Sequence, residues 1–376
     1  MPYNKHIFRL FAGCILQKGY NSYVICDLQR KRIRRIPKTL YFLLETFKNH
    51  SLKQIKDSFR HQHDTTIDEY FNFLHENEFG FFCSRQQSRL FSDIDLSFDH
   101  PSIISNAVID INKQSPFSLA HVLALLDDLH CRHIQLRFTG DYTAKELIGL
   151  LKSAESYPHN SIDVIFNYSA SISIKEILAI YSFPFVSELR IFNVPEKKIK
   201  GLQELSENDP IYFHSGGIAE SPSALSIENM QLNIRLFSES QKHHTYFNRK
   251  LYITAGGEIK NAPQCPEIFG NVQDQKSLRQ IAADAEFQKY WRISKEMTDV
   301  CGDCEFRNMC IDSRLPKQRS KGKWYHETEC SYNPYISKWK GEEGYRTLEE
   351  SGVTSSIKGI KINRRKLNAL NKELWD

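Results

Sequence analysis

The sequence predicts an α/β protein. Its centre is expected to be a parallel sheet, open or curved into a partial (β/α) barrel, between a small winged-helix module and a cysteine-rich C-terminal segment. Three observations lead to this fold class. Strand-like runs and three helix-like segments open the chain, apolar strands and helices alternate through its middle, and four cysteines cluster after residue 300. Strand–helix alternation is typical of a parallel sheet, because each crossover helix covers the sheet.

Length and composition limit the alternatives. The chain has 376 residues, which predicts two or three domains. A hydrophobic content of 40% supplies a sizeable core, and a formal net charge of +5 is too small to predict nucleic-acid binding by itself. No run of about 18 apolar residues occurs, and the first residues lack a signal-peptide core. We therefore expect a cytoplasmic protein with no membrane partner.

Residues 1–90 predict the winged-helix module. Strands are expected within residues 7–36, with a turn at 18–21 and a basic strand at 32–36. Pro37 ends that strand because its ring fixes φ and removes a donor. Three helices and a closing strand follow, at residues 40–47, 52–59, 67–77 and 79–82.

A basic run lies on and beside the strand at 32–36. Its proposed binding residues are Arg30, Arg32, Arg34 and Arg35. One interpretation is that they steer an acidic peptide, and the other is that they form a solvated strand face. A DNA-binding winged helix uses similar residues, so this fold leaves the ligand open.

Residues 91–104, which include Asp93, Asp95 and Asp99, indicate an acidic linker. Residues 105–240 then predict the sheet domain. Its strands are expected at 107–111, 133–138, 162–166, 188–194, 211–214 and 233–237, and its helices at 119–129, 144–156 and 174–181. Asp110, Arg137 and Asp163 fall on these strands, but the pattern does not combine them into a site.

Residues 241–340 predict a third domain. A β-hairpin is expected at 251–260, and an amphipathic helix at 277–291 leads to the cysteines. The basic tail, residues 341–376, would be either a partly helical docking arm or a solvated end.

The clustered cysteines are Cys301, Cys304, Cys310 and Cys330, in the spacing C-x2-C-x5-C-x19-C. Four thiolates at this spacing enclose a zinc ion or hold the corners of a cubane iron–sulfur cluster, and spacing alone does not separate the two. Five further cysteines are scattered singly and predict small buried apolar residues: Cys14, Cys26, Cys83, Cys131 and Cys265.

The hairpin, the helix ending at 287–291 and the cysteine spacing together resemble a SPASM domain, the auxiliary iron–sulfur domain of radical SAM peptide maturases. The region before them is similar to a partial (β/α) barrel of radical SAM type, and the N-terminal module resembles a PqqD-like leader-peptide recognition element. More narrowly, the chain resembles the SPASM-domain peptide maturase of grasp-with-spasm systems. Seven segments carry this resemblance: 9–12, 19–21, 25–30, 77–82, 248–250, 304–307 and 330–335.

This resemblance implies a cofactor and partners. The four clustered cysteines would hold one [4Fe–4S] cluster, with zinc as the alternative. Such a cluster leaves no iron open to substrate, so its role would be structural or electron-relaying. The arginine run would bind a precursor leader by β-augmentation. An ATP-grasp ligase and a small precursor peptide, encoded beside such proteins, would be the partners.

The chain also departs from the family. A radical SAM enzyme needs C-x3-C-x2-C after the first barrel strand, and residues 112–117 hold no cysteine. We therefore expect neither S-adenosylmethionine nor radical chemistry, and whether the chain is an enzyme stays open. The three ligand positions of a second SPASM cluster hold Tyr246, Ala262, and Ser313 or Arg314. Only one cluster is expected.

Three functions follow as hypotheses. The first is a maturation factor for a ribosomally synthesised, post-translationally modified peptide, which binds the precursor and works with the ligase. The second is an oxidoreductase that uses the remaining cluster for electron relay. The third is a zinc-bearing winged-helix regulator, which would bind duplex DNA with a steep salt dependence.

Overall fold

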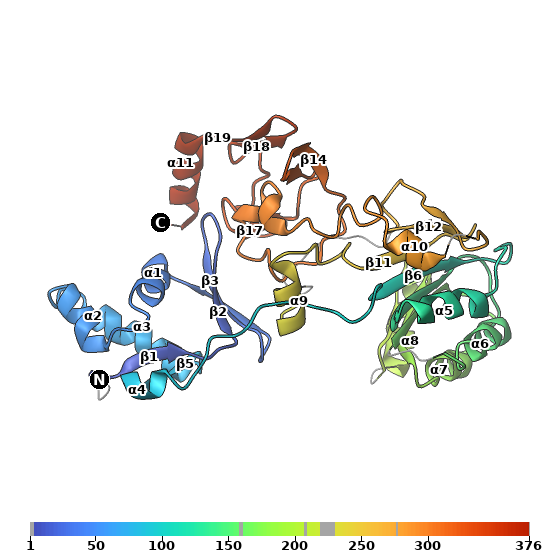
Figure 1. Cartoon of the computed structure of the whole chain (residues 1–376), viewed down its shortest axis with the longest axis horizontal. Helices are drawn as coiled ribbons and strands as arrows, with labels where there is room; N and C mark the ends of the chain where they lie inside the picture. The colour runs from blue at the N-terminus through green and yellow to red at the C-terminus, as the bar shows by residue number, and fades with distance from the viewer. Residues whose placement is uncertain (1–3, 158–160, 207–208, 219–229, 276, 376) are drawn as a thin grey trace. The chain divides into compact units, whose positions relative to one another are not determined.

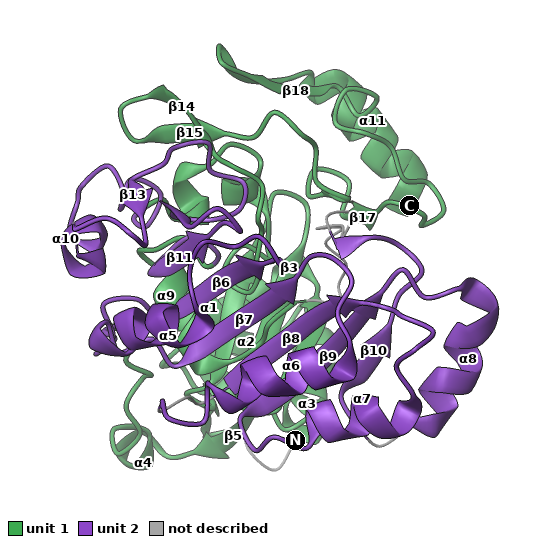
Figure 2. Ribbon diagram, turned by 90° about the vertical axis from the view of Figure 1, so that its right-hand side faces the viewer, with its two compact units in different colours: residues 1–98, 224–245, 293–376 green, residues 99–223, 246–292 purple. Residues whose placement is uncertain are grey.

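The computed structural model describes residues 4–157, 161–206, 209–218, 230–275 and 277–375. The chain forms two compact units (Figure 2). Unit 1 comprises residues 1–98, 224–245 and 293–376, and unit 2 comprises residues 99–223 and 246–292. No helix among the described residues is long and apolar enough to cross a membrane.

Unit 2 is built on an eight-stranded sheet with the order β10-β9-β8-β7-β6-β11-β12-β13. Figure 2 shows β6 to β10 side by side, and Figure 1 shows β11 and β12 beside β6. The strands from β10 to β11 in this order run parallel, and β12 and β13 are antiparallel additions. The strands are β6 (Asn106–Ile111), β7 (His133–Phe138), β8 (Ser161–Asn167), β9 (Val186–Phe192), β10 (Ile211–Phe213), β11 (Lys250–Ile253), β12 (Glu258–Lys260) and β13 (Gly270–Asn271). The predicted parallel sheet is confirmed.

Four helices lie on one side of this sheet (Figure 2). They are α5 (Leu119–Asp128), α6 (Ala144–Lys152), α7 (Ile174–Tyr181) and α8 (Glu196–Leu205). Thr143 and Ser173 begin α6 and α7 with capping boxes, in which a glutamate three residues later bonds back to the cap. Apolar side chains such as Leu136 and Leu189 are fully buried in the core of this unit.

Two local predictions are wrong. Residues 233–237 do not form a strand, because Asn233 caps helix α9 (Ile234–Ser240) by accepting a hydrogen bond from Leu236 N at 2.8 Å. The helix expected at 277–291 is only α10 (Leu278–Ala282). The Asp284 carboxylate accepts from Glu286 N at 2.9 Å, and such a local bond favours a turn over continued helix.

The N-terminal part of unit 1 combines two small sheets with short helices. Strands β1 (Ile7–Leu10) and β5 (Gly80–Cys83) pair, and β2 (Cys14–Lys18), β3 (Tyr23–Asp27) and β4 (Arg32–Ile36) form an antiparallel sheet. The helices are α1 (Lys38–Thr46), α2 (Leu52–Ser58), α3 (Asp64–Glu76) and α4 (Arg85–Ser88). Leu40, Leu52 and Leu74 pack with Ile25 of β3 in one core, so the helices cover one face of the three-stranded sheet.

The C-terminal part of unit 1 consists of hairpins and a final helix. The elements are β14 (Lys317–Ser320), β15 (Lys323–Tyr325), β16 (Tyr332–Asn333), β17 (Lys338–Trp339), β18 (Val353–Ser356), β19 (Gly359–Ile362) and α11 (Arg364–Trp375). Tyr335, Val353 and Leu367 share a core, and Val300 packs against it. The described residues of the basic tail are therefore folded, beside the segment that begins the cysteine cluster.

Candidate metal centre

The four clustered cysteines lie in unit 1. All four are free and partly exposed, whereas the five scattered cysteines are buried, as predicted for small apolar core residues. Cys301 begins a 3₁₀ turn, Cys301–Asp303, which Val300 enters with a φ of 68°. That value is rare for a β-branched residue, so the chain bends sharply just before its first cysteine.

Hydrogen-bond donors reach three of the sulfurs. Phe306 N donates to Cys304 Sγ at 3.4 Å, and Tyr332 N donates to Cys330 Sγ at the same distance. The Arg314 guanidinium lies 3.9 Å from Cys301 Sγ. N–H groups aimed at sulfur stabilise thiolate, which is the form that binds a metal.

The spacing of the sulfurs bears on the kind of metal. A zinc–sulfur bond of about 2.3 Å in a tetrahedral site puts neighbouring sulfurs about 3.8 Å apart. Among the described residues, the one group of three ligand atoms within 4.8 Å of one another is Cys301, Asp312 and His326. Within the described part of the chain, no three cysteine sulfurs lie within 4.8 Å of one another.

Burial disfavours the thiolate form at three of these cysteines. It raises the pKa of Cys304 and Cys310, and neighbouring negative charges raise both further. The pKa of Cys330 is also raised by burial, although Arg314 opposes the shift. A bound metal cation supplies the missing positive charge, so binding releases protons.

A buried ion pair lies beside the cysteines, and sequence reasoning did not predict it. Lys295 Nζ is 2.7 Å from Asp312 Oδ2, and the two side chains are only 2% and 1% exposed. Arg314 also binds Asp312, at 2.7 Å. A buried charge must be paired, so the carboxylate holds two cations next to the thiolates. Asp312 and Arg314 follow Cys310 closely in the sequence, and this proximity was the available signal.

Arg314 is, with Ser313, one of the two residues predicted from the resemblance to occupy a ligand position of a second SPASM cluster. Its guanidinium donates to Asp312 and to the carbonyl of Thr328, at 2.7 Å each. Nearby carboxylate and thiolate charges raise the pKa of Arg314, although burial opposes this. Arg314 is therefore a fixed cation of the remaining site, and it cannot act as a metal ligand.

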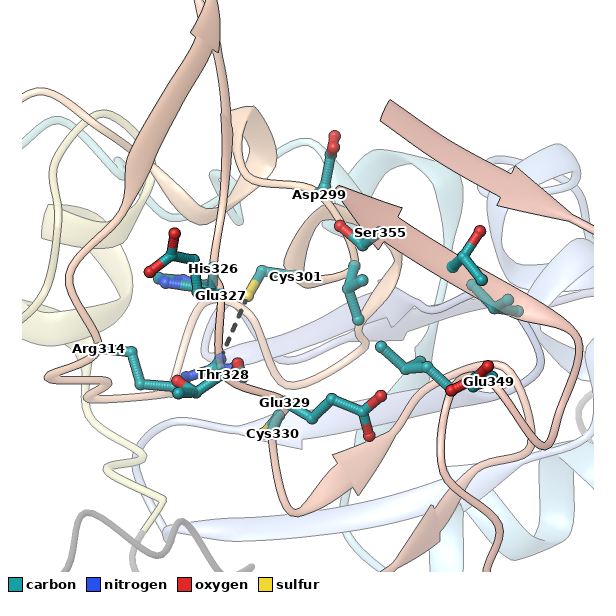
Figure 3. A pocket seen from close by; sticks show the side chains of 14 residues that line it. Asp299, Cys301, Arg314, His326, Glu327, Thr328, Glu329, Cys330, Glu349 and Ser355 are labelled. Carbon is teal, nitrogen blue, oxygen red and sulfur yellow. Dashed lines mark hydrogen bonds between the residues drawn. The ribbon is translucent and has the colours of Figure 1, made fainter. Parts of the chain in front are cut away.

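A pocket opens beside the centre (Figure 3). Its volume is about 190 Å³, and Cys301, Cys330, Arg314 and His326 are among its lining residues. Figure 3 shows Cys301 with His326 and Arg314 around it, and a dashed line marks the contact between Arg314 and the Cys301 sulfur. Two of the four clustered cysteines therefore line a pocket that a small molecule can enter.

The N-terminal sheet packs directly on the cysteine segment. Val24 and Cys26 of β3 share a core with Phe306, and Cys304, Cys310 and Cys330 contact that core. The hairpin between β2 and β3 adds hydrogen bonds: Tyr20 N donates to Asp303 O at 2.7 Å, Arg307 donates to Lys18 O at 2.7 Å, and Asn308 donates to Gln17 Oε1 at 2.9 Å. The predicted recognition module and the predicted metal site are thus parts of one unit.

The four arginines predicted to bind peptide have different surroundings. Arg30 and Arg32 bind the buried carboxylate of Asp27, at 3.2 and 3.3 Å. Arg35 donates to Ser337 O at 2.9 Å and lies over the Trp375 ring. Arg34 is exposed and donates to the neighbouring carbonyl of Ile33.

The charged residues of the central sheet also pair. Arg137 forks onto Asp110 at 2.5 and 2.8 Å, and Tyr252 OH donates to the same carboxylate at 2.7 Å. Asp163 instead accepts from Ser187 Oγ at 2.7 Å. Asp110, Arg137 and Tyr252 therefore form one polar group on the sheet, and Asp163 pairs with a different partner.

Comparisons with known proteins give distant structural likenesses. No protein-family model matches the chain, and no curated protein matches it. An open-conformation crystal structure of BtrN aligns with a TM-score of 0.32 at 11% identity, over 55% of this chain and 94% of BtrN. Streptococcus suis SuiB bound to S-adenosylmethionine aligns with a TM-score of 0.28 at 10% identity, over 81% and 95% of the two chains. SuiB bound to precursor peptide SuiA gives 0.27 at 11% identity, with the same coverage. We therefore build the functional proposal on the chain's own residues.

Proposed function

We propose that this protein is a maturation factor for a ribosomally synthesised, post-translationally modified peptide, and that its N-terminal module binds the precursor leader as an added strand on β4. The observation that carries the proposal is the edge position of β4. The sheet order is β2-β3-β4, and within the described residues β4 pairs with β3 alone. An edge strand presents unpaired N–H and C=O groups, to which a peptide strand can bond.

The opposite edge strand, β2, is less suited to receive a peptide. Ile15 and Leu16 of β2 line one groove with linker residues Asp93, Ile94 and Leu96. Lys48 and Arg9 bind the Asp93 carboxylate at 3.0 and 3.2 Å. The linker therefore lies beside β2, and we assign the leader to β4.

An apolar groove begins where β4 ends. Lys38 and Thr39, which follow β4 directly, line a groove of about 420 Å³ together with Phe42, Phe59 and Tyr70. The Phe42 side chain is 62% exposed although it is large and apolar. A leader strand on β4 that continued past Ile36 would place apolar side chains in this groove, which supplies affinity beyond the backbone bonds.

The existing contacts of the four arginines determine which of them can bind the leader. We assign Arg34, which is exposed on β4, to an acidic leader residue, with Lys38 at the mouth of the groove as a second cation. Arg30 and Arg32 instead hold Asp27, and Arg35 is engaged by the C-terminal segment. Their contribution to leader binding is therefore indirect.

The remaining parts of the proposal concern chemistry. Cys301, Cys304, Cys310 and Cys330 would hold one [4Fe–4S] cluster, whose four protein ligands leave no iron for substrate. The loop that follows β6, residues 112–117, contains no cysteine, so we propose no radical SAM reaction. An ATP-grasp ligase would close the bond in the precursor while this protein holds the leader.

The test is the affinity of the full chain for the small precursor peptide encoded beside it, measured by fluorescence anisotropy. Arg34→Glu and Phe42→Asp should each weaken binding at least tenfold, because one reverses the leader's charge partner and the other fills the groove with a charge. Lys145→Glu, an exposed site on α6 with the same charge change as Arg34→Glu, should bind like wild type. Unchanged affinity in both β4-side variants would reject the assignment. Point variants are preferable to deletion of residues 1–90, which would strip the shared core from the cysteine segment.

A second function, electron relay by the cluster, is favoured by the pocket at Cys301 and Cys330. Solvent access to the thiolates would let a redox partner approach. This function requires that the mass of the precursor change in the presence of this protein and a reductant without the ligase. A precursor mass that changes only when the ligase and ATP are present would reject electron relay as the activity.

A further inference from the structure

His326 is a histidine with the surroundings of a metal ligand, although it lies outside the cysteine spacing. It follows β15 and comes four residues before Cys330. Its side chain is only 4% exposed. Nδ1 lies 3.4 Å from the carbonyl oxygen of Leu315, and Nε2 is buried with no hydrogen-bond partner among the described residues.

The contact with Leu315 fixes which ring nitrogen carries the hydrogen. A carbonyl oxygen can only accept, so Nδ1 must donate to it, and in the neutral ring Nε2 then presents a lone pair. Metal-binding histidines characteristically use one nitrogen on the metal and donate the other N–H to a backbone carbonyl or a carboxylate. His326 has this arrangement.

The groups that face Nε2 are lone-pair donors as well. Nε2 lies 3.6 Å from Asp312 Oδ2, and Cys301 Sγ is within 4.8 Å of both residues' ligand atoms. The Asp312 carboxylate is already engaged by Lys295 and Arg314, each at 2.7 Å. Arg314 also donates to Asp312 Oδ1 through its backbone N and its Nε, at 3.0 Å each, so the four acceptor positions of the carboxylate are occupied. His326 Nε2 and Cys301 Sγ are the other two ligand atoms of this group.

We propose that His326 is a ligand of this metal centre. Its Nε2 and the Cys301 thiolate are alternative ligands for the same metal ion of the centre, which we call the Cys301 corner. The inference rests on the proposed metal centre and not on precursor binding. Either ligand alone is sufficient to hold that corner, and removal of both empties it.

The pocket makes this the exchangeable corner. Cys301, Cys330 and His326 line it, and of these two cysteines only Cys301 belongs to the three-ligand group, whereas neither Cys304 nor Cys310 is among the described lining residues. Cys304 and Cys310 instead contact the apolar core shared with β3. A corner with a spare ligand beside an open pocket can change ligands without loss of the metal, while the packed corners cannot.

The experiment uses the full chain, reconstituted anaerobically with iron and sulfide after incorporation of ¹⁵N-histidine. Cys301→Ala and His326→Gln should each keep most of the wild-type iron, and the double variant should lose it. Cys304→Ala, at a corner without a spare ligand, should lose the iron as a single variant. Pulsed EPR of dithionite-reduced Cys301→Ala should show strong ¹⁵N coupling from a bound imidazole.

His244→Gln in the Cys301→Ala background is the matched control. His244 is also buried and is influenced by the same Lys295 and Asp312 charges, but it lies outside the three-ligand group. That variant should keep both the iron and the ¹⁵N coupling. Loss of iron from Cys301→Ala alone, or retained iron without nitrogen coupling, would overturn the proposal.

Cobalt(II) provides a second measurement that does not depend on cluster assembly. The apoprotein of each variant, with folding checked by circular dichroism, is titrated with cobalt(II) alone. Each single variant should bind within about tenfold of wild type, and the double variant should bind more weakly than either by a further factor of about 10–100, the range typical when a metal site loses a supporting residue. Additive small losses would reject a shared corner. Failure of wild type to take up iron, with this cobalt pattern intact, would reject the cubane and keep His326 as a ligand.

Discussion

Phe306 should connect the stability of the cysteine segment to that of the N-terminal sheet. It is 1% exposed, and its ring lies 5.0 Å from Tyr332 and 5.9 Å from Trp339, centroid to centroid. The same core contains Val24 and Cys26 of β3. Phe306→Ala therefore removes packing from two segments that are far apart in the sequence.

The expected cost is large. Replacement of a buried phenylalanine by alanine removes about 3–5 kcal/mol of stability, because the apolar transfer energy and the cavity both count. Each 1.4 kcal/mol is a factor of ten in an equilibrium constant. Amides that exchange through opening of this core should thus lose protection by about 10²- to 4 × 10³-fold.

Hydrogen–deuterium exchange with mass spectrometry tests this prediction. In Phe306→Ala, peptides that cover β3 should lose protection together with peptides that cover residues 304–310. Phe287→Ala is the matched control, since Phe287 is fully buried in the core of unit 2. It should leave β3 protected. If β3 keeps its protection in Phe306→Ala while residues 304–310 lose theirs, the shared core does not couple the two segments.

Four further predictions concern unit 1. Removal of metal by a chelator should lower the thermal midpoint of unit 1 and raise exchange in β3, and a midpoint that ignores the chelator would contradict a structural role. Lys295→Met should cost about 3–5 kcal/mol in denaturant unfolding by leaving a buried carboxylate with one partner fewer, and Lys295→Met/Asp312→Leu should cost less than the single variant. Gly19→Ala should cost about 1–3 kcal/mol, because the added methyl would stand 2.9 Å from Glu305 N, and unchanged unfolding would show that the hairpin moves aside. Burial opposes the pKa shift of Asp27, but hydrogen bonds from two arginines lower this pKa below its usual value. The stability that ionised Asp27 contributes is therefore present above about pH 4 and is lost as the pH falls further. Asp27→Asn should flatten this pH dependence of the unfolding free energy, measured by urea titrations between about pH 5 and 3.

The sequence predicts the regular part of the fold well because local patterns determine it. Alternating strands and helices predict the parallel sheet of unit 2, and Pro37 separates β4 from α1. The wrong predictions occur where a short polar side chain outweighs the apolar pattern. Asn233 caps a helix in a run with strand-like composition, and Asp284 turns the chain where the apolar spacing continues.

The site is predicted less completely, because its charges come from segments that only the fold brings together. The cysteine spacing predicts a metal-binding segment, but it does not predict the part played by Lys295, which precedes the cysteines and is buried with Asp312. His326 is one of 14 histidines, and nothing in its local sequence distinguishes it. Its direction toward Cys301 follows from tertiary structure alone.

The position of the cysteine segment suggests why a centre without an open iron would be retained. One face of the β2-β3-β4 sheet packs on the helices of the N-terminal module, and Val24 and Cys26 of β3 pack on the cysteine segment. A leader strand added to β4 would extend this same sheet. Metal that orders the cysteine segment would then order the surface on which the leader binds, and by linkage the bound leader would favour the metal-loaded form to the same degree. A structural centre in this place would set the affinity of the proposed recognition module without touching the peptide.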